Sequence, residues 1–118
     1  GGDGGGGGGS CVALEYDWAA SGVPEGVELR MPFDVVICAD CLYAQASVEP
    51  LMAILELVVD PGRTLVVVSN EQRTAVESFL CLARTKGFEV TRMGIREVKL
   101  RGAIHARPVG LYSARRSQ

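Results

Sequence analysis

Short apolar runs separated by turn-forming residues divide this sequence into alternating strands and helices. Residues 33–39 and 64–69 each contain a continuous apolar run rich in β-branched side chains, which is typical of strands covered on both faces in a parallel sheet. Elsewhere, apolar side chains recur at helical spacing. One helix is expected over residues 47–59, before the Asp-Pro-Gly stop, and another over residues 74–86.

The ends of the expected helices carry capping residues. Ser47 is placed to be the N-cap of the first helix, with Pro50 in the first turn, where the missing N–H costs nothing. Thr74 and Glu77 match a capping box, in which the two side chains bond free backbone donors reciprocally. Gly87 is a C-cap signal for the second helix.

Three further strands complete the expected order. Residues 11–18 are a short strand candidate, and residues 88–93 and 109–114 follow the second helix. Strand–helix alternation implies parallel pairing through right-handed crossovers, whereas only a loop joins the last two strands. We therefore expect an α/β fold whose sheet is mostly parallel and ends in a C-terminal antiparallel hairpin.

Composition limits the chain to one small domain. It has 118 residues, of which 47% are hydrophobic and 22% charged, so most of it should fold. Residues 1–10 contain eight glycines and are expected to be a disordered Gly-rich linker, which leaves the domain to residues 11–118. We expect no membrane partner, because no segment has the length of a membrane span and no signal peptide is recognisable.

Charge is distributed unevenly along the chain. Residues 1–60 carry ten acids and one base, and residues 61–118 carry four acids and eleven bases, although the net charge is only −2. A basic half can meet an acidic partner or a nucleic acid. Its bases are scattered and few aromatic side chains lie among them, so a solvated surface is favoured and no nucleic-acid partner is expected.

Cys38 and Cys41 form a C-x-x-C, which raises a redox or zinc-binding interpretation. Against it, Cys38 lies inside an apolar run, and no second C-x-x-C or pair of histidines supplies further ligands. His105, the only histidine, falls in an expected loop over residues 102–108 and is expected to be exposed. We expect reduced, buried thiols in a cytoplasmic or nuclear protein, and no bound metal.

Polar side chains follow both apolar runs, at the carboxyl ends of the expected strands. Asp40 and Tyr43 follow the first run, and Glu71 and Arg73 follow the second. Ligands of open α/β sheets bind at this edge, so these side chains are candidates for a site. The alternatives are that Asp40 caps the next segment, that Tyr43 packs, and that Glu71 and Arg73 form a surface ion pair.

Taken together, these segments resemble the C-terminal part of a seven-stranded, S-adenosylmethionine-dependent methyltransferase with a partial Rossmann-like sheet. The most similar family is methyltransferase family 16, the protein-lysine methyltransferase-like group. The resemblance covers about residues 12–116, and four motifs in order carry it: Leu14 to Trp18, residues 33–43 with their Asp40-x-x-Tyr43 end, Pro50-Leu51 with its helix, and Val66 to Arg73.

The resemblance implies cofactor-binding residues. Trp18 would flank the adenine of S-adenosylmethionine, where a flat aromatic face stacks on a base, and Asp17 would shape that pocket. Ala39 and Asp40 would lie where the methionine end of the cofactor meets the target amine. Without the resemblance, Trp18 would be interpreted as a core or lid residue.

The resemblance also implies catalytic and substrate-binding residues. Asp40 and Tyr43 would be catalytic: Asp40 would orient the amine, and Tyr43 would line the target-side opening, where its ring can attract a cationic lysine. Glu71 and Arg73 would bind substrate near the entrance. The implied partner is a protein substrate, while the oligomeric state is left open.

The chain departs from the family pattern before residue 11. The strands with the acidic, glycine-spaced cofactor loop are absent, and the glycine run does not replace them. We therefore expect a fragment, a truncated gene model or a degenerate copy that alone binds S-adenosylmethionine weakly and is inactive. The leading interpretation is a parent that methylates protein lysine. The alternatives are a non-catalytic protein-interaction module on a degenerate methyltransferase fold and a redox or zinc protein.

Overall fold

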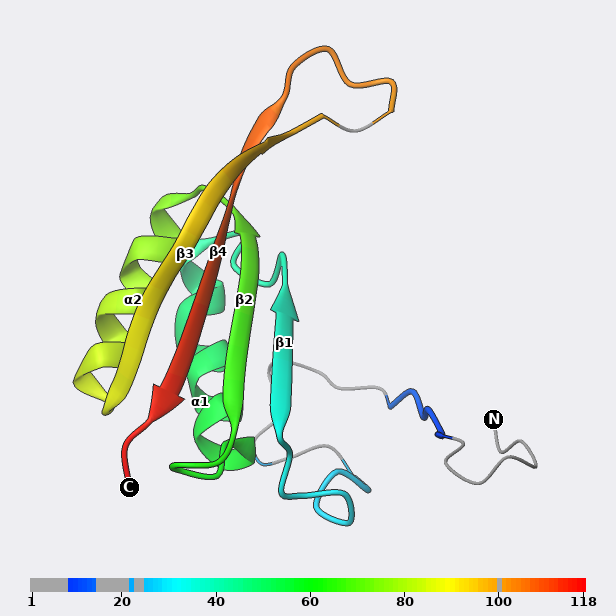
Figure 1. Cartoon of the computed structure of the whole chain (residues 1–118), viewed down its shortest axis with the longest axis vertical. Helices are drawn as coiled ribbons and strands as arrows, with labels where there is room; N and C mark the ends of the chain where they lie inside the picture. Colours follow the sequence, from blue (N-terminus) through cyan, green and yellow to red (C-terminus); the bar gives the residue numbers. More distant parts are fainter. Residues whose placement is uncertain (1–8, 15–21, 23–24, 100) are drawn as a thin grey trace.

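A single mixed sheet with two α-helices on one face forms the described part of the chain (Figure 1). The computed structural model describes residues 9–14, 22, 25–99 and 101–118. In order, these residues form β1 (Val35–Ala39), the 3-10 helix η1 (Gln45–Ser47), α1 (Val48–Val58), β2 (Leu65–Glu71), α2 (Thr74–Thr85), β3 (Phe88–Val98) and β4 (Arg107–Arg116).

The sheet has the strand order β1-β2-β4-β3. β1 and β2 run parallel, connected through α1, while β4 lies between β2 and β3 and is antiparallel to both. The α/β class and the closing hairpin are therefore confirmed, but the described sheet is mixed instead of mostly parallel, because β4 pairs with β2 as well as with β3. Residues 11–14 of the first expected strand belong to no strand, and residues 15–18 lie outside the described residues.

Pairing with β4 lengthens the predicted strands. β2 continues through Asn70 and Glu71 because these residues pair with Gly110 and Val109 of β4. β3 continues to Val98, beyond the predicted end at residue 93, and contains a register shift between Arg92 and Gly94. Gly94 has φ 152°, a value that side chains with a Cβ disfavour, so this glycine accommodates the bulge.

The helices and the N-cap position of Ser47 are confirmed, but the predicted side-chain capping hydrogen bonds are wrong. η1 already gives Ser47 helical dihedral angles, so its side chain makes no capping hydrogen bond to α1. The N-cap of α2 is Arg73, which has extended dihedral angles and no side-chain cap, and Thr74 is the first helical residue instead of the cap. The C-terminal signal is confirmed: Gly87 has φ 90° and follows the C-cap of α2.

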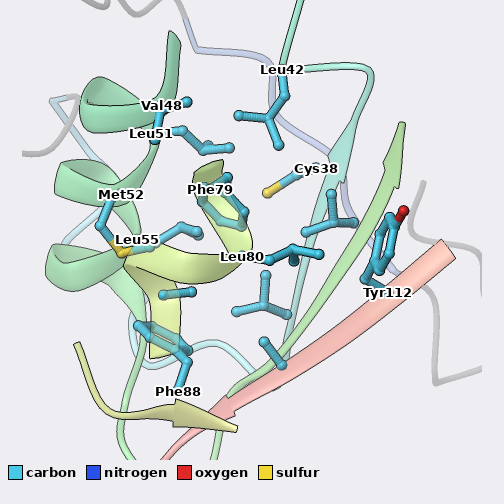
Figure 2. Packing of buried hydrophobic residues seen from close by; sticks show 14 of the residues in the cluster. Cys38, Leu42, Val48, Leu51, Met52, Leu55, Phe79, Leu80, Phe88 and Tyr112 are labelled. Atoms are coloured by element: carbon cyan, nitrogen blue, oxygen red, sulfur yellow. The ribbon is translucent and has the colours of Figure 1, made fainter. Parts of the chain in front are cut away.

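The hydrophobic core lies between the two α-helices and one face of the sheet (Figure 2). The helical spacing predicted this packing, because Val76, Phe79, Leu80 and Ala83 of α2 are all buried. Leu42, in the turn that follows β1, is completely buried in the same cluster. Burial of one such leucine contributes about 1.5–3 kcal/mol, so the turn after β1 is anchored to the core.

The opposite face of the sheet is not covered by any described residue. Ile37 of β1 is 70% exposed and Ile95 of β3 is 62% exposed. The prediction that β1 is covered on both faces is therefore wrong for the described structure, since both α-helices pack on the same side (Figure 1). Neither described helix has the length and apolar composition needed to cross a membrane.

Candidate functional site

A cavity of about 230 Å³ opens at the carboxyl ends of β1 and β2. The two strands end side by side, since Ala39 pairs with Ser69 and the Asp40 N–H donates to the Ser69 carbonyl oxygen at 2.7 Å. Opposite these ends, the adjoining ends of β3 and β4 and the chain between them supply the other wall. The lining residues are Ala39, Asp40, Ser69, Asn70, Glu71, Val98, Ala103, His105, Arg107 and Val109.

Asp40 has a left-handed backbone conformation at the end of β1. Its φ of 53° places it in the left-handed region, which costs a non-glycine residue roughly 1–2 kcal/mol and which Asp and Asn tolerate best. Strained residues of this kind concentrate at functional sites. Its side chain is exposed, and its carboxylate has no ion-pair partner among the described residues. The pocket therefore contains one carboxylate that is available to a ligand.

Glu71 is the second carboxylate of the pocket and is held by two arginines. The Arg107 Nη1 and Arg73 Nη2 groups each lie 2.8 Å from an oxygen of the Glu71 carboxylate. The hydrogen bond from Arg107 lowers the pKa of Glu71, and the charges of both arginines lower it further. The predicted ion pair of Glu71 and Arg73 is therefore confirmed, and its carboxylate also lines the cavity, while the predicted role in substrate binding stays a prediction.

Asn70 fixes the turn that carries Asp40. Its side-chain oxygen accepts a hydrogen bond from the Leu42 N–H at 2.9 Å, and its side-chain nitrogen donates to the Leu42 carbonyl oxygen at 3.1 Å. The same nitrogen donates to the Glu71 carbonyl oxygen at 2.8 Å. Asn70 is 1% exposed, so these contacts are shielded from water and hold the ends of β1 and β2 together.

The structure gathers some of the predicted site residues and leaves others apart. Ala39, Asp40 and Glu71 line the cavity, and Arg73 reaches it through its ion pair with Glu71. Tyr43 is 63% exposed and is not among the lining residues. The predicted adenine-binding residues, Asp17 and Trp18, lie outside the described residues.

Sequence reasoning missed the wall that comes from the other end of the chain. His105 was expected only to be an exposed loop residue, but together with Arg107 it lines the cavity. Arg107 is brought to Glu71 because β4 returns beside β2, with Val109 opposite Glu71. The local sequence does not predict that Arg107 lies beside Glu71, because this contact depends on the order of the strands in the sheet.

The two cysteines of the C-x-x-C contact one another beside the site. Cys38 is buried near the end of β1, and the Cys41 thiol donates a hydrogen bond to the Ala39 carbonyl oxygen at 3.7 Å. The interaction between the two thiols lowers the pKa of Cys41 to about 7 and, with burial, raises the pKa of Cys38. In the described part of the chain, no three His, Cys, Asp or Glu side chains are grouped as metal ligands.

Most of the chain matches the profile of a known protein family. A family profile described as lysine methyltransferase matches residues 9–86. This chain belongs to the lysine methyltransferase family, methyltransferase family 16. The match includes the strand ends with Asp40, Asn70 and Glu71, and it confirms the resemblance seen in the sequence. A search of curated proteins found no match.

Methyltransferases generally use S-adenosylmethionine as the methyl donor, and two of the predicted cofactor-binding residues, Ala39 and Asp40, line the cavity. The small side chain of Ala39 leaves room at the end of β1, and the unpaired Asp40 carboxylate suits a cationic centre or an amine. The cavity is smaller than the roughly 300–1,000 Å³ usual for small-molecule sites, so these residues enclose only part of such a ligand.

Proposed function

We propose that this chain forms the target side of a site that transfers a methyl group from S-adenosylmethionine to a lysine side chain of a protein. Membership of the lysine methyltransferase family supports the reaction class. The observation that carries the proposal is Asp40, an unpaired carboxylate in a left-handed turn at the carboxyl end of β1, inside the cavity. A cytoplasmic or nuclear location is part of the proposal.

Asp40 orients the amine that receives the methyl group. S-adenosylmethionine supplies, when bound, a methyl group on a positively charged sulfur. The Asp40 carboxylate accepts a hydrogen bond from the neutral lysine amine, which directs the nitrogen lone pair toward that methyl group. As the nitrogen–methyl bond forms, the sulfur–methyl bond breaks, and the sulfur keeps the electron pair and leaves as a neutral thioether. The methylated ammonium then loses a proton to solvent. This reaction depends on alignment more than on a strong base, so Asp40 is assigned orientation and not proton abstraction.

The residues around Asp40 shape the path of the substrate. Glu71 stays ionised and immobile because Arg73 and Arg107 hold it, and it lines the approach to Asp40. Tyr43 is exposed at the same end of β1, where its ring can attract the lysine by a cation–π contact before the amine enters. Asp17 and Trp18 are assigned to the adenine end of the cofactor.

Replacement of the Asp40 carboxylate tests the proposal. Asp40→Asn keeps the shape and tolerates the left-handed turn, but it removes the charge. In the longest natural protein that contains these 118 residues, we expect the rate of methyl transfer to lysine to fall about 100-fold. Transfer of labelled methyl from S-adenosylmethionine, with mass spectrometry of the modified residue, measures this rate.

Asp34→Asn is the matched control, because Asp34 is an exposed acid before β1 whose partner is Arg63 and which does not line the cavity. It should leave the rate unchanged. An unchanged rate in Asp40→Asn would remove Asp40 from the site. Absence of lysine methylation in the unmodified protein, with intact binding of a protein partner, would favour the non-catalytic interaction module.

A further inference from the structure

The β3–β4 hairpin extends past the carboxyl ends of β1 and β2, on the side of the molecule where the cavity opens (Figure 1). β2 ends at Glu71, opposite Val109, whereas β3 and β4 remain paired as far as Val98 and Arg107. We call residues 96–107 the hairpin arm. Its base contributes Val98, His105 and Arg107 to the cavity, so a chain bound along the arm would pass the cavity opening.

The hairpin arm is basic. Arg96, Lys99, Arg101 and Arg107 are exposed, and the one acid among its described residues is Glu97. Arg107 is neutralised by Glu71, but Arg96, Lys99 and Arg101 have no ion-pair partner in the described part of the chain. Exposed Ile104, with 82% of its surface accessible, adds an apolar contact at the same place.

The charge pattern combines this positive arm with a negative centre. The Asp40 carboxylate lies in the cavity without an ion-pair partner, while the unpaired bases lie outside it on the hairpin arm. A positively charged or amine-bearing side chain therefore fits the cavity, and negatively charged groups fit the surroundings. A peptide with a lysine between acidic residues matches this pattern. Its lysine fits the cavity beside Asp40, and its acidic flanks fit the basic hairpin arm.

We propose that the hairpin arm binds an acidic polypeptide segment and so selects lysines that are flanked by Asp or Glu. The selection of lysine rests on the proposed function, whereas binding of the acidic flanks rests on the arm alone. A nucleic acid fits less well, because residues 93–109 contain no Phe, Tyr or Trp for base stacking and the Asp40 carboxylate repels phosphates.

Binding of labelled peptides to the 118-residue chain tests this proposal. The probes are a short peptide with one lysine between acidic residues, the same peptide with Ser in place of each acid, and a single-stranded RNA. By fluorescence anisotropy at low salt, the acidic peptide should bind at least roughly tenfold more tightly than the Ser peptide, and added salt should weaken it. Equal affinity for both peptides, or tighter binding of the RNA, would overturn the proposal.

A triple variant locates the binding surface. Arg96→Gln/Lys99→Gln/Arg101→Gln should weaken binding of the acidic peptide roughly tenfold, because it removes three exposed charges worth a few tenths of a kcal/mol each. The matched control, Arg63→Gln/Arg84→Gln/Arg115→Gln, removes three exposed charges at the opposite end of the sheet and should retain binding. An equal loss in both variants would show a nonspecific charge effect and would contradict a site on the arm.

The two proposals fail separately in these experiments. Peptide binding needs no methyl donor, so a peptide that binds through the arm but is never methylated by the longer protein would remove the methyl-transfer proposal and retain the arm. Lysine methylation that is equally fast for acidic and Ser peptides would remove the proposal for the hairpin arm and retain the methyl-transfer proposal.

Discussion

Asn70 is the residue on which the position of the candidate site most depends. It is almost completely buried, and it satisfies both the N–H and the carbonyl group of Leu42, two residues after Asp40. An aspartate in the left-handed region persists only where its surroundings hold it there. The hydrogen bonds from Asn70 and the burial of Leu42 supply that restraint. Asn70, which was not a predicted site residue, therefore holds the turn that carries the Asp40 carboxylate.

Asn70→Ala should lower the free energy of unfolding by about 2–4 kcal/mol, because it leaves the buried N–H and carbonyl groups of Leu42 without partners. Urea unfolding measures this change. Gln45→Ala is the control: Gln45 also donates a side-chain hydrogen bond, to Ser78 at 3.0 Å, but it is exposed and should cost less than about 0.5 kcal/mol. A loss for Asn70→Ala as small as that of the control would contradict the restraint assigned to Asn70.

At the scale of elements, α2 and β3 are joined by an ion pair as well as by the core. The Arg92 guanidinium donates two hydrogen bonds to the Glu77 carboxylate, at 3.1 and 2.7 Å, and its Cζ lies 5.8 Å from the centre of the Tyr112 ring. Arg92 stands next to the bulge, from which β3 continues into the hairpin arm. This contact therefore links the helix layer to the base of the projecting hairpin.

The ion pair makes part of the stability depend on pH. The hydrogen bond from Arg92 lowers the pKa of Glu77 below its ordinary value of 4.5, so this contribution is present above about pH 4.5 and is lost as the pH falls through the lower pKa of the folded state. Both side chains are about half exposed, which limits the contribution to roughly 0.5 kcal/mol.

Urea unfolding of Glu77→Gln at pH 7 and at pH 3 tests this dependence. The variant should be less stable than the unmodified chain at pH 7 and about equal to it at pH 3. Glu89→Gln, an exposed acid of β3 with no ion pair in the described structure, should show no such difference. The same deficit of Glu77→Gln at both pH values would rule out the ionic origin.

For the molecule as a whole, the dominant feature is a sheet with helices on one face only. The cavity lies at the strand ends, and its described walls come from β1, β2 and the β3–β4 hairpin. Its volume of about 230 Å³ is below that of most small-molecule sites. The described residues therefore enclose less space than a small-molecule site usually provides.

This incomplete enclosure leads us to expect weak binding of S-adenosylmethionine by the 118-residue chain. Isothermal titration calorimetry should show a dissociation constant well above the micromolar range, because a ligand enclosed on one side retains much of its solvent exposure. Asp40→Asn serves as the site-specific control for any heat observed. Micromolar binding that Asp40→Asn weakens would show that the chain alone holds the cofactor.

The sequence by itself determined the local elements and the positions of the candidate polar groups. Apolar runs and helical spacing predicted β1, β2, α1 and α2. A buried strand or helix face needs apolar side chains at its own spacing, whichever elements pack against it. The polar residues at the strand ends, Asp40 and Glu71, were predicted from the same pattern, since the end of an apolar run marks the end of a strand.

Only the tertiary structure decided which distant residues complete the site. The return of β4 beside β2 places Arg107 on Glu71 and His105 in the cavity, and the burial of Asn70 under Leu42 fixes the turn at Asp40. The helix caps and strand ends also differ from the predicted ones. η1 precedes α1 and alters its N-terminus, and pairing with β4 extends β2 and β3. Neighbours across a sheet depend on strand order, which local periodicity does not record.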